Sequence, residues 1–464
     1  MPTPLASDSD RMTGRAWALL FVLCGAIFLE GIDVSMMGVA LPSIRAELGM
    51  TTSELQWVVS AYVLSYGGFV LLGGRAADLL GRRRMFVGWL VVFLLFSGLG
   101  GFATEGWMLI VARFMTGVAA AFMTPAGLSI ITTTFPEGPQ RNKALLVYAG
   151  TAAGGFSLGM VAGGLLAAID WRWVFFAPVL LSAVILALAI RLIPREARPA
   201  RIAGGFDVLG AIMLTGSMLL LVSTVVLAPD VSPVRSVITL ALSLVLLAAF
   251  IRHERRSALP LVRLGIFRSA ALVRANLGAM LLVGSFVGFQ FIAVLYLQEV
   301  RHWSELETGL ALMVIGLDAI LAPTLTPVLV RRFGNPAVIV TAFVLAVAAY
   351  ALFLPLSNDW TYAAMLPAFL LLSLAFSFGY GPLTIAATDG VAEEEQGLAS
   401  GVLTTSFQFG SALGLAVVAS VIAASEGGLR TALVVPLVAG ALGVLVSAPG
   451  LKTRQVAPST ATAA

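Results

Sequence analysis

The sequence predicts an all-α polytopic membrane protein. Hydrophobic residues make up 59% of its 464 residues and charged residues only 11%, against roughly 45–50% and about 25% in ordinary globular domains. The apolar residues gather into about fourteen runs, each long enough to cross a bilayer as a helix. Lys and Arg collect in alternate loops between these runs, as they do on the cytoplasmic side of membrane proteins.

The predicted spans follow one another at short intervals. Taking about 18 or more mostly apolar residues as one span, they lie near residues 17–40, 55–74, 85–103, 107–129, 144–168, 173–193, 208–228, 234–251, 271–298, 307–330, 336–356, 361–385, 398–424 and 430–449. A twelve-span alternative without 208–228 and 234–251 leaves every later loop on the same side, so charge does not exclude it. Length does, because both runs are long enough to cross, with only the short segment PDVSP between them.

The basic residues predict the orientation. With the N-terminus in the cytoplasm, 22 of the 28 Lys and Arg residues fall in inner segments, five in outer segments and one, Arg113, inside a span. We therefore expect both termini in the cytoplasm and the protein in the cell (inner) membrane. Residues 1–16 are polar and the next apolar run is longer than a signal-peptide core, so no cleavable signal is expected.

Composition also argues against several kinds of function. Cys24 is the only cysteine, which excludes an internal disulfide and any metal site built on several thiolates. Neither of the two lysines lies in a phosphate-binding G-x-x-x-x-G-K-[ST] loop, and there is no H-E-x-x-H motif. The net charge of +4 comes from loops between spans. We expect no metal, no cofactor and no nucleic-acid partner.

Two carboxylates, Glu30 and Asp33, lie inside the first span, in FLEGIDVSMMGVALP. They are three residues apart, so on a helix they point to nearly the same face. Each costs about 2.5–3.5 kcal/mol at the bilayer centre, so such residues are retained only where they face a polar interior. Two neighbouring carboxylates in a low dielectric do not both ionise easily, so the pair can hold a proton or a cation. A structural pair bonded to hydroxyls and Arg is the alternative.

Arg113 is the only basic residue placed well inside a span. Its guanidinium keeps its charge and needs an acidic or carbonyl partner, for which the carboxylates of the first span are the nearest candidates in type. Protonation of that carboxylate would release Arg113 and so couple proton binding to helix packing. The alternative is that the side chain snorkels to the interface.

Other polar and aromatic residues in the spans are candidate ligands. Asp318, in the tenth run, is either a second cation-binding carboxylate or a buried Asp bonded to local backbone. Gln290 and Gln408 either line a cavity or bond between helices. Trp57 and Tyr62 are candidates for cation–π contact with a substrate, although aromatic side chains near span ends also anchor to the interface.

Three polar features near the span ends have simpler interpretations. Asp207 is expected to start a helix. His253 and His302 are expected in loops, too far apart in the sequence for a shared metal site. The acidic run 393–395 is expected to be a solvated inner turn.

Several motifs resemble the major facilitator superfamily. GGRAADLLGRRRMF, between the second and third spans, is similar to its loop 2–3 motif, with matching residues Gly74, Asp78, Gly81, Arg82 and Arg83. ARFMTGVAAA, with Arg113, resembles the arginine motif of the fourth span. GFSLGMVAGG resembles the antiporter glycine motif, with glycines Gly155, Gly159, Gly163 and Gly164. LQWVVSAYVLSYGG, IDWRWVFF, FDVLGAI and IDVSMMGVALP, which contains Asp33, are similar to the fourteen-span drug:proton antiporter family.

The resemblance implies two six-helix bundles, two extra central helices and alternating access. The implied boundaries are a cytoplasmic tail at 1–16, a bundle at 17–195, a linker with the two extra transmembrane helices at 196–256, a bundle at 257–450 and a cytoplasmic tail at 451–464. It also implies that Asp33 and Arg113 take part in coupling and that the loop 2–3 motif latches the cytoplasmic side. The glycines repeat every fourth residue and form a smooth face that another helix can approach closely.

The chain departs from the family pattern at several positions. Leu79 replaces the arginine usual after Asp78, and Met160 stands where the antiporter motif usually has proline. LVRRFGNP, residues 329–336, is a faint second copy of the loop 2–3 motif, with Arg331 where aspartate is expected. TTSFQFGSALG contains none of the acids that some multidrug relatives bear in the penultimate span, which disfavours dicationic substrates.

We therefore expect a proton-coupled secondary exporter of drugs or toxic compounds that are hydrophobic or cationic. We do not expect an enzyme. Its expected partners are a small-molecule substrate, protons and the lipid bilayer, and it is expected to be a monomer. Proton coupling is assigned to Asp33, Glu30 and Arg113, and substrate binding to Glu30, Asp33, Trp57, Tyr62, Gln290, Asp318 and Gln408. One alternative is a dedicated exporter of a single secondary metabolite or other small molecule. A membrane-embedded enzyme is a remote alternative, since neither a metal cluster nor an activated nucleophile is found.

Overall fold

The computed structural model describes residues 12–50, 52–194, 207–226, 231–257, 260, 262–357, 360–424 and 428–455. Every regular element in this part of the chain is a helix, and 13 helical segments are long and apolar enough to cross a membrane. A further helix, α7, adds a shorter apolar stretch, Val208–Thr224. The predicted all-α polytopic fold is thereby confirmed. Most of the predicted tails and the boundary at 195–196 lie outside the described residues.

The first six predicted runs form an N-terminal group of helices. They are α1 (Gly14–Leu48), α2 (Thr52–Leu80), α3 (Arg82–Gly101), α4 (Gly106–Thr134), α5 (Pro139–Ile169) and α6 (Trp173–Leu192). Within the group, α1 packs on α5, α2 on α4, and α3 on α4 and α6. Helix α1 continues past the predicted end at residue 40, because it ends only where Gly49 adopts the left-handed conformation, with φ of 64°.

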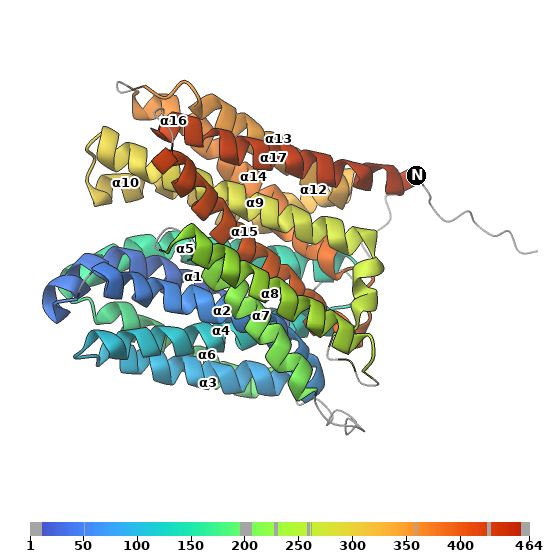
Figure 1. Cartoon of the computed structure of the whole chain (residues 1–464). Helices are drawn as coiled ribbons and strands as arrows, with labels where there is room; N and C mark the ends of the chain where they lie inside the picture. The colour runs from blue at the N-terminus through green and yellow to red at the C-terminus, as the bar shows by residue number, and fades with distance from the viewer. Residues whose placement is uncertain are drawn as a thin grey trace, which may run out of the picture.

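The C-terminal group holds the α-helices from α9 onward. They are α9 (Ala270–Leu295), α10 (Glu305–Leu312), α11 (Asp318–Thr324), α12 (Thr326–Phe333), α13 (Asn335–Phe353), α14 (Tyr362–Thr388), α15 (Gln396–Ala424), α16 (Gly428–Ala432) and α17 (Val434–Ser447). Short 3-10 or π turns are η2 (Leu264–Arg268), η3 (Tyr296–Val300), η4 (Met313–Leu317), η5 (Glu393–Glu395) and η6 (Ala448–Gln455). The blue-to-teal and yellow-to-red groups lie side by side (Figure 1) and meet where α2 packs on α15 and α5 packs on α11.

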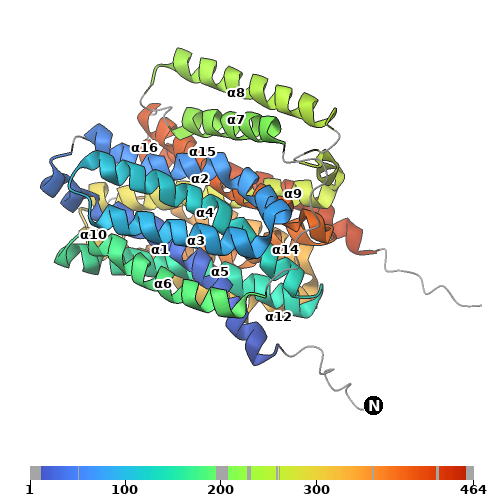
Figure 2. The same ribbon diagram turned by 90° about the horizontal axis from the view of Figure 1, so that it is seen from below.

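The two extra helices lie together on one edge of the molecule. They are α7 (Val208–Val226) and α8 (Pro233–Glu254), and they pack on each other beside α2 and α15 (Figure 2). Helix α7 approaches α2 closely, because side-chain atoms of Val222 and Leu219 fill the space where Gly67 and Gly68 would carry a Cβ. The extra pair therefore rests on both groups at once, since α2 belongs to one and α15 to the other.

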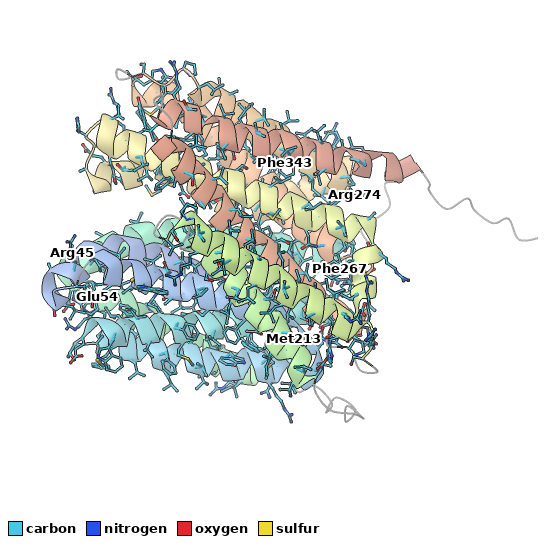
Figure 3. The ribbon with its side chains drawn as sticks, viewed as in Figure 1. Arg45, Glu54, Met213, Phe267, Arg274 and Phe343 are labelled. Atoms are coloured by element: carbon cyan, nitrogen blue, oxygen red, sulfur yellow. The ribbon has the colours of Figure 1, made fainter. Side chains whose placement is uncertain are left out.

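The helices run between two ends of the molecule. Arg45, near the end of α1, and Glu54, near the start of α2, mark the end that we name the α1–α2 end (Figure 3). Phe267 and Arg274 lie toward the other end, which we name the α2–α3 end because Gly81 joins these helices there.

The tenth predicted run is interrupted, unlike the single span expected over 307–330. It consists of α10, the 3-10 turn η4, and then α11 and α12. Pro323 and Pro327 lack the backbone N–H that a continuous helix needs, and the break between α11 and α12 falls at Leu325, between them. The 3-10 turn immediately precedes Asp318, so the irregular backbone places this carboxylate.

The glycine face of α5 packs directly on α1, as its spacing predicts. A Cβ at Gly155, Gly159 or Gly163 would lie within 2.8 Å of Phe28, Ile32 or Met36 backbone atoms of α1. Gly164 is partly exposed and lies off this face. The close approach of α5 holds the segment of α1 that contains both intramembrane carboxylates.

This packing predicts that Gly159→Ala destabilises the protein. The added methyl group would lie 2.7 Å from the Ile32 Cα, and such overpacking costs about 1–3 kcal/mol. We expect a lower free energy of unfolding and a lower Tm, measured on the purified protein in detergent. Gly88→Ala in α3 is the control, because nothing lies within 4 Å of its Cβ position. Equal Tm values for the two variants would contradict the packing described.

Candidate functional site

A large cavity lies between the two helix groups. Its volume is about 540 Å³, within the range typical of small-molecule sites. Seven polar or acidic residues line it in addition to Tyr380: Glu30, Ser60, Tyr62, Gln290, Asp318, Gln408 and Ser411. Aromatic residues cover much of the remainder: Phe156, Phe286, Phe291, Phe376, Tyr380 and Phe407. The cavity is therefore largely apolar, with a few polar groups contributed by both helix groups.

Glu30 reaches this cavity from the middle of α1 and is held by three side chains. Its Oε2 accepts hydrogen bonds from Tyr66 Oη and Thr124 Oγ1, both at 3.0 Å. The amide of Gln408, on α15, donates to Oε1 at 3.5 Å. Glu30 thus joins α1, α2 and α4 to a helix of the other group.

Asp33 has a different environment, although it is only three residues away. Its Oδ2 lies 2.5 Å from Arg113 Nη1, and both residues are 2% exposed. Arg113 also donates to the Val58 carbonyl at 3.4 Å, and its guanidinium lies 4.4 Å from the centroid of the Tyr62 ring. Asp33 is not among the residues that line the cavity. The predicted partnership of Arg113 with the first helix is confirmed, but only one of the two carboxylates takes part.

Asp318 supplies the carboxylate of the C-terminal group. It is 3% exposed and lines the cavity at the start of α11. Its Oδ1 has no hydrogen-bond partner among the described residues. A buried carboxylate oxygen without a donor is costly, so Asp318 is suited to a ligand that brings positive charge or a hydrogen-bond donor.

The remaining predicted ligands differ in position. Tyr62, Gln290 and Gln408 line the cavity, with the Tyr62 ring lying against Arg113. Trp57 does not line the cavity, and 38% of its surface is exposed.

Sequence reasoning missed the aromatic pairs of the cavity wall. Tyr380 of α14 and Phe407 of α15 stack with ring centroids 4.3 Å apart and planes 9° apart. Phe286 and Phe376 form a second close pair at 4.3 Å. In each pair the two rings come from different helices, so no local pattern identifies them.

A latch joins the two groups at the α2–α3 end. Asp78, at the end of α2, accepts hydrogen bonds from the backbone N–H groups of Gly397 and Leu398, both at 3.0 Å. These N–H groups begin α15, where the helix dipole favours a negative charge. Gly74 lies against Gly397 and Gly401, which allows the two helices to approach. We name these contacts the Asp78 latch.

Two basic residues of the same motif, Arg82 and Arg83, contact different parts of the protein. Arg82 donates to the Glu393 carbonyl at 2.6 Å and lies 3.7 Å from Asp78. Arg83 instead donates to the Ile190 and Ile193 carbonyls at the end of α6. Gly81 provides the turn between α2 and α3, with φ of 100°. The acidic run 393–395 is therefore not merely a solvated turn, because Glu393 joins the latch and Glu395 lies 3.7 Å from Arg263.

Asp207 and His253 also meet, at the base of the extra helices. Asp207 Oδ1 accepts from the Gly210 N–H at the start of α7, as expected of a helix-start residue. His253 lies in the last turn of α8, not in a loop, and its Nε2 is 2.9 Å from Asp207 Oδ2. The sequence did not show this pair, because its members start one helix and end the next.

The membrane-spanning fold, the central cavity and the latch at one end define a membrane transporter rather than an enzyme. The Major Facilitator Superfamily model matches residues 23–415. The chain therefore belongs to the major facilitator superfamily.

Known relatives and solved structures agree with this assignment. The puromycin resistance protein pur8 of Streptomyces alboniger is 36% identical over 88% of this chain and 82% of its own length. The multidrug efflux pump LfrA of Mycolicibacterium smegmatis is 28% identical over 90% of this chain and 83% of its own. The crystal structure of the human organic anion transporter MFSD10 covers 94% of this chain and all of its own, with a TM-score of 0.69 and 16% identity. That structure shows a shared fold.

The latch geometry predicts that Asp78→Ala opens the α2–α3 end. Hydrogen bonds to a charged group contribute about 1.5–3 kcal/mol each, so the open population should rise at least about tenfold. The measurement uses Ala399→Cys in a Cys24→Ala background, because Ala399 is fully buried and directly follows the latch residue Leu398. We expect faster labelling of the introduced thiol by a membrane-impermeant maleimide. Asp170→Ala, at the α1–α2 end, is the control, and an unchanged rate in Asp78→Ala would show that the latch does not close this end.

Proposed function

We propose that this protein exports amphipathic, mainly cationic antibiotics or drugs in exchange for protons, by alternating access. The observation that supports this most directly is the cavity between the two groups, where Glu30 and Asp318 face an aromatic wall. Carboxylates attract a cation, and aromatic faces bind both its charge and its apolar surface. We further propose that the protein lies in the cell membrane with the latch and both termini on the cytoplasmic side.

Exchange follows from the electrostatics of Glu30. An ionised carboxylate in a largely apolar cavity is costly unless a cation or a proton neutralises it. Substrate and proton therefore compete for this group, and each displaces the other. With the Asp78 latch closed, the described cavity extends toward the α1–α2 end, where external protons would enter and substrate would leave.

The Asp33–Arg113 pair has a supporting part in this proposal. Breaking a buried ion pair by removing one partner costs about 3–5 kcal/mol, so the pair holds α1 against α4 while both groups are charged. Its protonation would free Arg113 and loosen these helices. Coupling therefore involves Glu30, Asp33 and Arg113, but only Glu30 touches the cavity.

The breadth of substrates separates two forms of the proposal. The name of pur8 refers to one antibiotic and that of LfrA to many drugs. The wide aromatic wall, with few hydrogen-bonding groups, favours several amphipathic substrates over one polar compound. The test is transport by the purified protein in proteoliposomes across a panel of cationic and neutral drugs, with and without a pH gradient. Gradient-driven transport of a single compound would support the dedicated exporter instead.

Neutralising the two carboxylates of α1 should have different effects. Glu30→Gln removes the titratable carboxylate that α1 contributes to the cavity, so gradient-driven transport should fall at least about a hundredfold with little change in Tm. Asp33→Asn leaves Arg113 with a weaker partner, so it should lower both transport and Tm. Transport assays and thermal unfolding of both variants provide the measurement. Wild-type transport in Glu30→Gln, or unchanged efflux of every tested cation in Asp33→Asn, would contradict the proposed coupling.

Asp318→Asn should weaken binding of cations selectively. Loss of the charge removes an interaction of about 1.5–3 kcal/mol, so the KM for cationic drugs should rise at least about tenfold. Neutral drugs should keep their KM, because the amide fills nearly the same volume. Asp207→Asn, outside the cavity, is the matched control. An equal rise for neutral and cationic drugs would assign Asp318 to structure rather than to charge recognition.

A further inference from the structure

A second, smaller cavity adjoins Glu30. Its volume is about 40 Å³, enough for about two or three water molecules. Six residues with hydroxyl groups line it: Tyr66, Thr124, Tyr148, Tyr380, Thr384 and Thr404. We name it the hydroxyl chamber. It is separate from the larger cavity described above, which we name the substrate cavity, although Glu30 lines both.

The hydroxyl chamber lies between Glu30 and the Asp78 latch. On α15, Thr404 falls between Leu398 of the latch and Gln408 of the substrate cavity. On α14, which runs toward the α2–α3 end, Thr384 comes after Tyr380. The chamber is therefore displaced from the substrate cavity toward the end that the latch closes.

A few residues line both cavities and form the wall between them. The stacked rings of Tyr380 and Phe407 line both cavities, as do Gln408 and Ile27. A drug-sized molecule cannot enter a space of about 40 Å³. Glu30 is the one acidic group among the chamber's lining residues, and Tyr66 and Thr124 donate to it from the chamber.

We propose that the hydroxyl chamber is the route by which the proton leaves Glu30 toward the α2–α3 end. The O–H bond of protonated Glu30 breaks, and the proton passes to the oxygen of a water molecule in the chamber. The carboxylate that remains accepts hydrogen bonds from Tyr66 and Thr124, and the excess proton moves along the water toward the latch. Substrate stops at the Tyr380–Phe407 wall. Asp33 lines neither cavity, so it does not release the proton by this route.

This proposal rests on the proposed function and assigns Thr384 and Thr404 as positioning residues for chamber water. Neither hydroxyl donates to Glu30, because Thr384 donates to the Tyr380 carbonyl and Thr404 to the Ser400 carbonyl of their own helices. Their oxygens remain able to accept a hydrogen bond from water. Replacement by Val keeps the volume but leaves a drier, more apolar chamber.

The test compares two modes of transport in proteoliposomes, with puromycin and ethidium as probes. The double variant Thr384→Val/Thr404→Val should reduce pH-gradient-driven transport at least about tenfold. Exchange of labelled for unlabelled probe at equal pH should stay within about twofold of wild type, because no proton has to leave Glu30. Thr388→Val is the matched control, since Thr388 lies one turn further along α14 and does not line the chamber. Thr384→Ser/Thr404→Ser keeps both hydroxyls and should retain net transport.

The outcomes separate the two proposals. Gradient-driven transport that is equal in wild type and in the Val pair would overturn the chamber as the proton route. An equal loss of net transport and of exchange in the Val pair would assign the two threonines to structure and also overturn it. A wild-type protein that transports neither probe in response to the gradient would refute the proposed function, and this proposal with it.

Discussion

An ionised side chain inside a membrane span must be paired or must face a polar cavity, and the arrangement of this protein depends on that constraint. Arg113 cannot shed its charge, so α4 has to lie where an acid can reach it. Asp33 meets it at 2.5 Å, and this pair sets the register of α1 against α4. With Asp33 so engaged, Glu30 one turn away is directed to the cavity and to the hydroxyls of Tyr66 and Thr124. One pairing thereby decides which carboxylate a solute can reach.

The two helix groups make contacts that can break and re-form. At the α2–α3 end, the Asp78 latch consists of hydrogen bonds to the first N–H groups of α15 and of glycines that allow backbone contact. Such contacts can be released without exposing a large apolar surface, unlike the interdigitated side chains inside each group. Glycine faces such as that of α5 on α1 give smooth helix surfaces. Helix α7 adds apolar packing on both α2 and α15. The extra pair of helices therefore contributes to the contact between the two helix groups.

The two cavities divide substrate and proton by size. The larger one has aromatic walls and two carboxylates from opposite groups, which suits an amphipathic cation. The smaller one admits only water-sized particles and is lined by hydroxyls. Glu30 belongs to both, and this shared position is what makes a single carboxylate suitable for exchange. The break in the tenth run has a related effect. The 3-10 turn ends directly before Asp318, which begins α11 and lines the larger cavity.

The sequence by itself determined the membrane class, the spans and the motifs. Hydropathy and length depend only on local composition, so the runs that became α1 to α6 and α13 to α15 were predictable, as was the close packing of Gly155, Gly159 and Gly163. Only the tertiary structure decided how the charges are shared. Glu30 and Asp33 are equivalent in spacing and chemistry, yet Arg113 from α4 engages one and leaves the other to the cavity. Segments that are distant in the chain likewise meet in the Phe286–Phe376 pair, in the hydroxyl chamber and in the contact of Glu393 with Arg82. Their partners are fixed by the packing of whole helices, which no local sequence pattern records.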